Sequence, residues 1–292
     1  GRPGPVVVDV PKDVQNWQGV YAGRGTLAST GVYQRRRREL DARRLGEAQL
    51  ESFFQILQGA KRPLVYAGGG VIHAGAAQAL REFSSTFGIP VVTTLMGIGS
   101  VDTHDALCLR MLGMHGAAFA NYAVEDCDFL IAMGARFDDR VAGAPAKFAP
   151  RATHIAQLDI DPAEINKVKT VQWSHIGDME DALRSLVAWG RKHGVRPDFS
   201  AWQGAVGALK RNHPMNYDRD STLIQPYYVL EEINRHTDGE AIISTGVGQH
   251  QMWAAQYLDF REPRLWLTSG SMGTMGFGLP AAIGAQVAHP DR

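Results

Sequence analysis

The stretch LGMHGAAFANYAVEDCDFLIAMGARFDDR (residues 112–140) holds a turn, a helical segment, an apolar strand and a charged strand end in direct succession. Residues 118–124 are predicted to be helical, and residues 129–134 have the continuous apolar character of a buried strand. A methionine sulfur, an imidazole, two arginines and two carboxylates surround that strand. Because packing alone does not need such a polar cluster, we expect an extended, charged cofactor and a small anion to meet here.

The same alternation of strand and helix continues on both sides of this stretch. Further strands are predicted at PLVYA (63–67), PVVTT (90–94), HIAQLDID (154–161) and VQWSHIGD (171–178). Helical faces lie between and around them, at Leu50, Phe53, Phe54 and Leu57, at Ala76, Ala79, Leu80, Phe83 and Phe87, and at Leu183, Leu186, Val187 and Trp189. This alternation predicts right-handed βαβ units and an α/β fold with a doubly wound, Rossmann-like parallel sheet.

A second strand-and-helix series follows Pro226, a residue suited to the first position of a helix. Its helical face is Val229, Leu230 and Ile233, its strands are residues 241–245 and 265–268, and two loops lead into helices at residues 246–256 and 269–285. This series predicts the start of a second α/β domain.

The pattern suggests five parts along the chain. They are the end of an N-terminal domain (1–20), a linker (21–48), a central domain (49–190), an irregular polar linker (191–224) and the beginning of a C-terminal domain (225–292). VVVDV (6–10) reads as a strand already under way, and the chain stops directly after an apolar helix. We therefore expect both ends to be cut from a longer protein.

Composition narrows the class of protein. The 292 residues are 45% hydrophobic and 21% charged with a formal net charge of zero, so neither nucleic acid nor an anionic membrane is an expected partner. The chain lacks an apolar run of the length that a membrane span needs and a recognisable signal peptide. Cys108 and Cys127 form no CxxC motif, which favours a reducing compartment, and we expect a cytoplasmic protein.

The predicted strand ends are GGG, TLMG, GARFDDR, LDID and IGD, all rich in glycine or hydrogen-bonding groups. Ligands of parallel sheets bind beyond the carboxyl ends of the strands, so a nucleotide-type cofactor is expected there. The GGG turn is not the dinucleotide fingerprint, because His73 stands where a third glycine would be and no acid follows about 20 residues on. Plain NAD binding is therefore disfavoured.

Several polar residues in these loops allow two interpretations. Asp159 and Asp161 point the same way on a strand, where they would accept a ribose diol, hold a metal, or cap the turn at Pro162. Residues 136–140 form either a surface ion-pair ladder or an arginine site for a carboxylate. His115 is either a structural histidine or a ligand-binding one.

The second series has its own candidate site. Gln249 and His250 stand at a helix start after a strand, where they would contact a phosphate. Met275 lies between glycines in a flexible loop, a place that core packing does not explain, and it is suited to support a ring.

Six segments together resemble the acetolactate synthase (acetohydroxyacid synthase) large-subunit family of thiamine diphosphate enzymes. In that family's order they are GRPGPVVVDVPKDVQ (1–15), MLGMHG (111–116), ARFDDRV (135–141), LDIDPAEI (158–165), GVGQHQMWAAQ (246–256) and SGSMGTMGFGLPAAIGA (269–285). Each segment alone is weakly diagnostic, whereas six in register are specific.

The resemblance implies an enzyme that decarboxylates pyruvate on thiamine diphosphate and joins the product to pyruvate or 2-ketobutyrate. The products would be 2-acetolactate or 2-aceto-2-hydroxybutyrate, in the first common step of branched-chain amino acid biosynthesis. It also implies a structural FAD in the central domain, a magnesium ion, a homodimer or homotetramer, and a small regulatory subunit.

The resemblance assigns residues to each ligand. FAD would be lined by Arg2, Gly68, Gly69, Gly70, Thr94, Leu95, Met96, Met114, His115, Gly134, Arg136, Asp138, Val141, Asp159, Ile160, Asp161, Gly177 and Asp178. The second ketoacid would meet Met114 and Arg140. Thiamine diphosphate would meet Val247, Gly248, Gln249 and His250 at its diphosphate, and Gly273 and Met275 at its aminopyrimidine.

The chain also departs from the family pattern. The activating glutamate, on the pyrimidine-binding domain, and the Gly-Asp-Gly…Asn element for Mg²⁺ both fall outside these residues, so no metal ligand is expected here and the piece should be inactive alone. Ser271-Met272 replaces the usual Gly-Leu. Two alternatives remain: a sister thiamine diphosphate enzyme such as a pyruvate oxidase or glyoxylate carboligase, and a non-catalytic FAD-binding flavoprotein.

Overall fold

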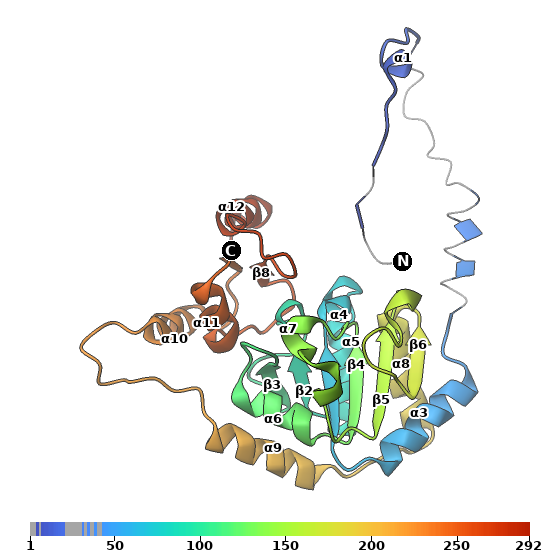
Figure 1. The fold of residues 1–292 in the computed structure, drawn as a ribbon, viewed down its shortest axis with the longest axis vertical. Coiled ribbons are helices and arrows are strands. Elements are labelled where there is room, and N and C mark those ends of the chain that lie inside the picture. The colour runs from blue at the N-terminus through green and yellow to red at the C-terminus, as the bar shows by residue number, and fades with distance from the viewer. Residues whose placement is uncertain (1–3, 6, 21–30, 32–33, 36–37, 40–42) are drawn as a thin grey trace.

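Six parallel strands form the main sheet in the order β3-β2-β1-β4-β5-β6 (Figure 1). They are β1 (Pro63–Ala67), β2 (Val91–Thr93), β3 (Cys108–Met111), β4 (Phe129–Met133), β5 (His154–Asp159) and β6 (Trp173–Ile176). The computed structural model describes residues 4–5, 7–20, 31, 34–35, 38–39 and 43–292. The direction of the strand order reverses between β1 and β4, which is where doubly wound sheets bind their ligands.

Helices cover the two faces of this sheet and bury an aromatic core (Figure 1). The helices around the sheet are α3 (Glu47–Gly59), α4 (Gly69–His73), α5 (Ala77–Phe87), α6 (Ala118–Asp126), α7 (Asp139–Ala142), α8 (Met179–Lys192) and α9 (Ser200–Asn212). Phe53 meets Phe54, Phe83 and Trp173 edge to face with ring centroids 5.1–6.1 Å apart. The expected βαβ architecture is confirmed, because the apolar faces read from the sequence are the ones that pack on the sheet.

Among the first 190 residues, the described ones also contain four short elements. They are α1 (Lys12–Gln15) and the 3-10 turns η1 (Leu95–Gly97), η2 (Pro145–Lys147) and η3 (Pro162–Glu164).

Two expectations about secondary structure are wrong, and one strand was missed. Residues 7–10 form no strand, since no neighbouring strand in the described residues pairs with them, and Val7 is 89% exposed. Strand β3 was not expected, because it is short and Arg110 interrupts its apolar run. The expected linker at residues 191–224 is not irregular throughout, because α9 lies there and the indole of Trp202 donates to Pro63 O at 2.9 Å.

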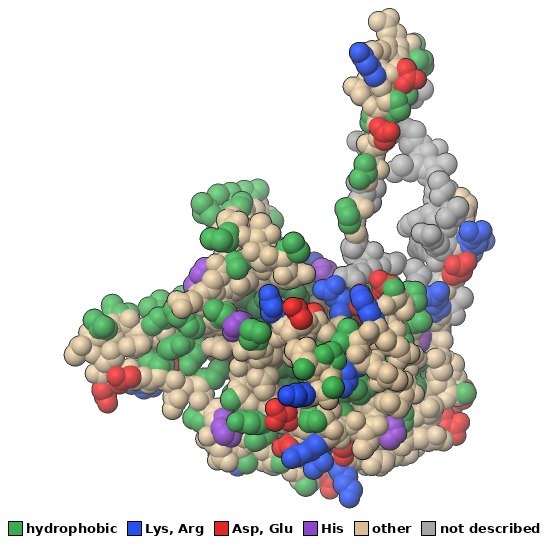
Figure 2. Space-filling view, viewed as in Figure 1, with side chains coloured by type: hydrophobic (Ala, Val, Ile, Leu, Met, Phe, Trp, Pro, Cys, Tyr) green, Lys and Arg blue, Asp and Glu red, His purple; other side chains and the backbone are tan. Residues whose placement is uncertain are grey.

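The second unit lies beside the β3 edge of the main sheet (Figure 1). It contains α10 (Pro226–Thr237), β7 (Ile243–Thr245), α11 (Gln249–Tyr257), β8 (Trp266–Thr268) and α12 (Gly278–Ala288), and β7 pairs with β8 in parallel. Its small core of Phe260, Leu265 and Trp266 also takes in Ile98 and Met111 of the first unit. Hydrophobic side chains gather on exposed α12 (Figure 2).

Among the described residues, no helix is both long and apolar enough to cross a membrane.

Candidate cofactor and substrate site

The residues expected to line one cofactor all follow the carboxyl ends of the main-sheet strands, apart from Arg2, which lies outside the described residues, and Val141, which lies in α7. They are Gly68–Gly70 after β1, Thr94–Met96 after β2, Met114 and His115 after β3, Gly134, Arg136 and Asp138 after β4, Asp159–Asp161 at the end of β5, and Gly177 and Asp178 after β6. We call these residues the strand-end row. Six strands spaced about 4.8 Å apart make the row about 24 Å long. The row therefore suits an extended ligand.

Glycines allow the β1 and β4 ends to approach closely at the centre of the row. A Cβ on Gly68 would lie 2.2 Å from Gly134 O, and a Cβ on Gly70 would lie 2.6 Å from Gly134 Cα. Backbone hydrogen bonds bridge the two ends, from Gly68 N to Met133 O at 2.9 Å and from Gly70 N to Gly134 O at 3.1 Å. At the switch point of the sheet, the GGG turn after β1 therefore packs directly against the backbone at the end of β4.

Four carboxylates along the row act as local caps. Asp138 accepts from Arg140 N, Asp161 from Ala163 N and Asp178 from Asp181 N, at 3.0–3.1 Å. These three residues are the N-caps of α7, η3 and α8. Asp159 accepts from Asp161 N at 2.9 Å. The turn-capping interpretation of Asp161 is therefore confirmed, and capping fixes each carboxylate in place at the strand end.

Asp159 is the buried member of this set. Burial raises the pKa of its carboxyl, hydrogen bonds from the Asp161 and Ile160 amides oppose the rise, and the nearby Glu164 adds to it. A buried acceptor at a strand end suits a ligand hydroxyl that would donate to it.

The structure brings together the two residues expected to contact a substrate. Met114 N donates to Arg140 O at 2.9 Å, and a Cβ on Gly113 would lie 2.9 Å from the same oxygen. Met114 is 66% exposed, and the Arg140 side chain is 72% exposed with its Nη1 3.2 Å from Asp139 Oδ2. The surface ion-pair interpretation holds for Arg140 and Asp139, and such an exposed pair is held by about 0–1 kcal/mol.

The second unit assembles its own expected site. Gly248 precedes α11, Gln249 and His250 begin that helix, and a Cβ on Gly273 would lie 3.4 Å from Val247 Cγ1. The side-chain amide of Gln251 donates to Thr268 Oγ1 at 2.7 Å and ties the helix to the end of β8, directly before the glycine-rich loop. Met275 is 81% exposed, so it belongs to no core.

Contacts between the two units join both sets of residues. A Cβ on Gly270 would lie 2.4 Å from Met96 Sδ, so the glycine-rich loop touches the end of β2. The side chain of Gln256 donates to His115 O at 2.7 Å.

Two features of the site were not visible in the sequence. Tyr66 on β1 packs against Phe137 and Phe148, and its buried hydroxyl has no hydrogen-bond partner in the described part of the chain. Burial, with Asp138 nearby, raises the pKa of Tyr66, so the phenol stays neutral behind the row. Arg110 on β3 is the other feature, and nothing in its local sequence marks it as a contact between units.

Possible metal ligands and the two thiols are the remaining reactive groups of the described residues. No group of three or more His, Cys, Asp or Glu there is arranged to hold a metal ion. Both cysteines are buried and free, and burial raises the pKa of Cys127 to about 12, which keeps that thiol protonated and unreactive.

Two protein-family models match the sequence of this chain. "Thiamine pyrophosphate enzyme, central domain" matches residues 50–186, and "Thiamine pyrophosphate enzyme, C-terminal TPP binding domain" matches residues 246–292. The chain belongs to the thiamine pyrophosphate enzyme family.

Within that family the chain is similar to acetolactate synthases. It is 45% identical to the chloroplastic acetolactate synthase of Arabidopsis thaliana over 293 aligned positions, which cover 100% of this chain and 42% of the relative. It is 46% identical to acetolactate synthase 1 of Nicotiana tabacum, with 100% and 43% covered, and 47% identical to acetolactate synthase 1 of Oryza sativa subsp. japonica, with 99% and 44% covered. The chain thus spans less than half the length of these relatives.

Proposed function

We propose that the protein containing this chain is an acetolactate synthase, which decarboxylates pyruvate and joins the two-carbon remainder to pyruvate or 2-ketobutyrate. The contact between Met114 and Arg140 beside the junction of the two units carries this proposal. Thiamine diphosphate, when bound, would supply the decarboxylation chemistry.

Arg140 would bind the carboxylate of the second ketoacid. A guanidinium fits a carboxylate through two parallel hydrogen bonds. The free energy needed to break the ion pair between Arg140 and Asp139 is small, because water already screens this exposed pair. Arg140 is therefore free to bind a substrate instead. Met114, whose backbone N–H donates to Arg140 O, would cover the apolar part of the same substrate.

FAD is proposed to lie along the strand ends as a structural cofactor. Support comes from the length of the row, its glycine-lined centre and the capped acids, of which Asp159 offers an acceptor for a ribose hydroxyl. Val247 to His250 would face the diphosphate of thiamine diphosphate, and Gly273 and Met275 its aminopyrimidine. Mg²⁺ would be held by residues outside this chain.

The remaining parts of the proposal concern partners and place. The substrates would be 2-ketoacids, the catalytic subunit would form a homodimer or homotetramer, and a small regulatory subunit would join it. A cytoplasmic location is proposed from the cysteine usage, whereas the names of the relatives above assign them to chloroplasts. Imaging of a fluorescent fusion would distinguish these locations.

Replacement of Arg140 tests the substrate assignment in the protein expressed from its complete gene. Arg140→Ala should lower use of the second ketoacid by about tenfold or more, while release of CO₂ from pyruvate changes less. CO₂ release from pyruvate is measured in a single turnover, and product formation is measured from pyruvate with and without 2-ketobutyrate. Arg151→Ala, which removes an exposed arginine paired with Asp126, is the matched control.

Equal losses in both steps would contradict the role of Arg140. Absence of acetolactate from the wild-type reaction would contradict the proposed activity itself.

A further inference from the structure

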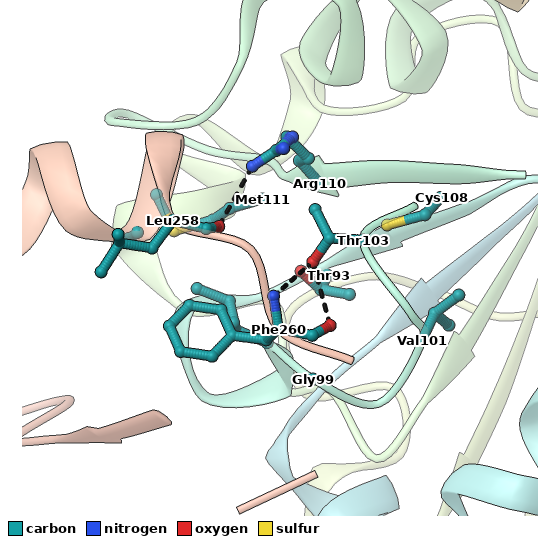
Figure 3. Close-up of a pocket in the computed structure, with 11 residues that line it drawn as sticks. Thr93, Gly99, Val101, Thr103, Cys108, Arg110, Met111, Leu258 and Phe260 are labelled. Carbon is teal, nitrogen blue, oxygen red and sulfur yellow. Dashed lines mark hydrogen bonds between the residues drawn. The ribbon is translucent and has the colours of Figure 1, made fainter. Parts of the chain in front are cut away.

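The two units meet through a set of contacts that we call the interdomain clasp: Arg81, Thr103 and Arg110 of the first unit and residues 256–261 of the second. A small cavity of ≈ 20 Å³ lies beside it (Figure 3). Its walls include Cys108, Met111 and Phe260. The clasp is therefore built mainly of polar contacts around a nearly filled interface.

Arg110 makes the contacts nearest to a helix end. Its Nη1 donates to Gln256 O at 3.0 Å and Leu258 O at 3.2 Å, and its Nη2 donates to Asp259 Oδ1 at 2.5 Å. The side chains of Arg110 and Asp259 are 21% and 16% exposed. Hydrogen bonds to a charged donor in such partly dry surroundings are stronger than those between neutral groups.

The backbone of Arg110 adopts an unfavourable conformation to make these contacts. Its φ is 60°, in the left-handed region that residues other than glycine enter only at a cost. Such a cost persists where surrounding contacts outweigh it. The contacts that Arg110 gains lie entirely in the second unit, at residues 256, 258 and 259.

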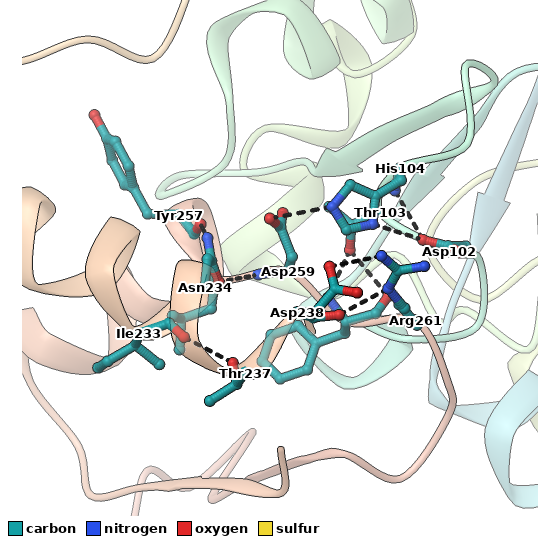
Figure 4. A network of polar contacts seen from close by, with 12 residues as sticks. Asp102, Thr103, His104, Ile233, Asn234, Thr237, Asp238, Tyr257, Asp259 and Arg261 are labelled. Carbon is teal, nitrogen blue, oxygen red and sulfur yellow. Dashed lines mark hydrogen bonds and ion pairs between the residues drawn. The ribbon is translucent and has the colours of Figure 1, made fainter. Parts of the chain in front are cut away.

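These contacts complete the carboxyl end of α11. The last carbonyls of a helix have no partner within it, and a cation there is favoured by the helix dipole. Arg110 donates to Gln256 O. On the other side, the side chain of Asn234 in α10 donates to Tyr257 O at 2.7 Å and accepts from Asp259 N at 2.9 Å (Figure 4). The helix end is thus held from both sides.

The other clasp residues hold the chain beyond the helix. Thr103 Oγ1 donates to Phe260 O at 3.1 Å and accepts from Phe260 N at 2.9 Å. Arg81 Nη2 donates to Arg261 O at 2.7 Å. Removal of Arg110 should therefore loosen α11 while the units stay attached.

We propose that Arg110 is a positioning residue that fixes α11 so that its amino end, Gly248 to His250, meets the diphosphate of thiamine diphosphate. This inference rests on the proposed function. Helix α11 runs from Gln249 to Tyr257, which is about 13 Å at 1.5 Å per residue. A tilt of about 10° about its carboxyl end would move the amino end by about 2 Å, more than a hydrogen bond tolerates.

Arg110→Gly tests the inference in the protein expressed from its complete gene. Glycine adopts the left-handed backbone without steric cost, so the variant loses the arginine side chain and its contacts without added backbone strain. Arg264→Gly is the matched control, because Arg264 is exposed, has φ 67°, and makes no hydrogen bond or ion pair with the described residues. Each protein is titrated with thiamine diphosphate in excess magnesium, and amide exchange is followed at residues 249–258 and in β1 and β4.

We expect Arg110→Gly to weaken thiamine diphosphate binding by about tenfold or more and to speed exchange at residues 249–258. Exchange in β1 and β4 should not change, and Arg264→Gly should behave as wild type. Arg110→Lys, which keeps the charge, should recover part of the affinity.

Equal affinity and exchange in Arg110→Gly and Arg264→Gly would overturn the role of Arg110, whereas a wild type that binds no thiamine diphosphate would overturn the proposed function. If Arg110→Gly does not fold, thiamine diphosphate affinity is measured in Arg110→Lys and Asp259→Asn instead. Wild-type affinity in both of these would refute the inference.

Discussion

Gly68→Ala is the sharpest test of the close approach at the switch point of the main sheet. The new Cβ would lie 2.2 Å from Gly134 O and 2.8 Å from Ala135 Cα. Both neighbours are backbone atoms, so no side chain can swing away to make room. The ends of β1 and β4 must separate instead.

The cost has two sources. Overpacking at a rigid site costs about 1–3 kcal/mol. Separation of the strand ends also strains the hydrogen bonds from Gly68 N to Met133 O and from Gly70 N to Gly134 O, each worth about 1 kcal/mol. A loss of about 3 kcal/mol would lower the unfolding midpoint by about 6–12 °C in a domain of this size.

Thermal unfolding followed by circular dichroism measures this shift. Gly59→Ala is the matched control, since Gly59 ends α3 and a Cβ there meets nothing within 4 Å. That variant should unfold at the wild-type midpoint or slightly above it, because alanine favours helix. Agreement of the two midpoints to within about 1 °C would refute the argument from close approach. FAD affinity should fall in Gly68→Ala alone.

Two further changes test the site acid and the unexpected helix. Because the pKa of Asp159 is raised by burial, the stability that this group contributes is present below its unfolded pKa of about 3.9 and is lost as the pH rises through the folded pKa. Asp159→Asn, which keeps an acceptor for Asp161 N, should therefore exceed wild type in urea midpoint at pH 7 and match it below about pH 4; an equal advantage at both pH values would contradict this. Trp202→Ala should destabilise the first unit by about 3–5 kcal/mol, measured by urea unfolding, because the indole is 3% exposed and hydrogen-bonded to Pro63 O. Trp17→Ala, at a tryptophan that is 72% exposed, is its control, and equal midpoints would show that α9 adds nothing to the core.

Central strands were the most predictable elements of this fold. The apolar run at residues 63–67 is β1 to the residue, and the predicted strand at residues 129–134 differs from β4 by one position. Strands buried on both faces must be continuously apolar, so their ends are marked where polar residues or glycines begin. The edge strand β3 lacks this mark, because a charged side chain is tolerated there.

Helix α9 shows the opposite case. Glycines and polar residues fill its sequence, and Trp202 and Val206 are its buried positions. Two buried residues leave too weak a period to separate a helix from a linker.

The sequence by itself determined that polar strand ends would share one edge of a parallel sheet, because alternating strands and helices permit little else. Only the tertiary structure decided their neighbours. The strand order sets the GGG turn against Gly134. The backbone of Met114 meets that of Arg140 although β2 and β1 lie between their strands, β3 and β4. Arg110 shows the reason most directly, since it binds backbone carbonyls 146 and 148 residues away. Every residue offers the same carbonyl, so no side-chain pattern in the sequence records which one an arginine will reach.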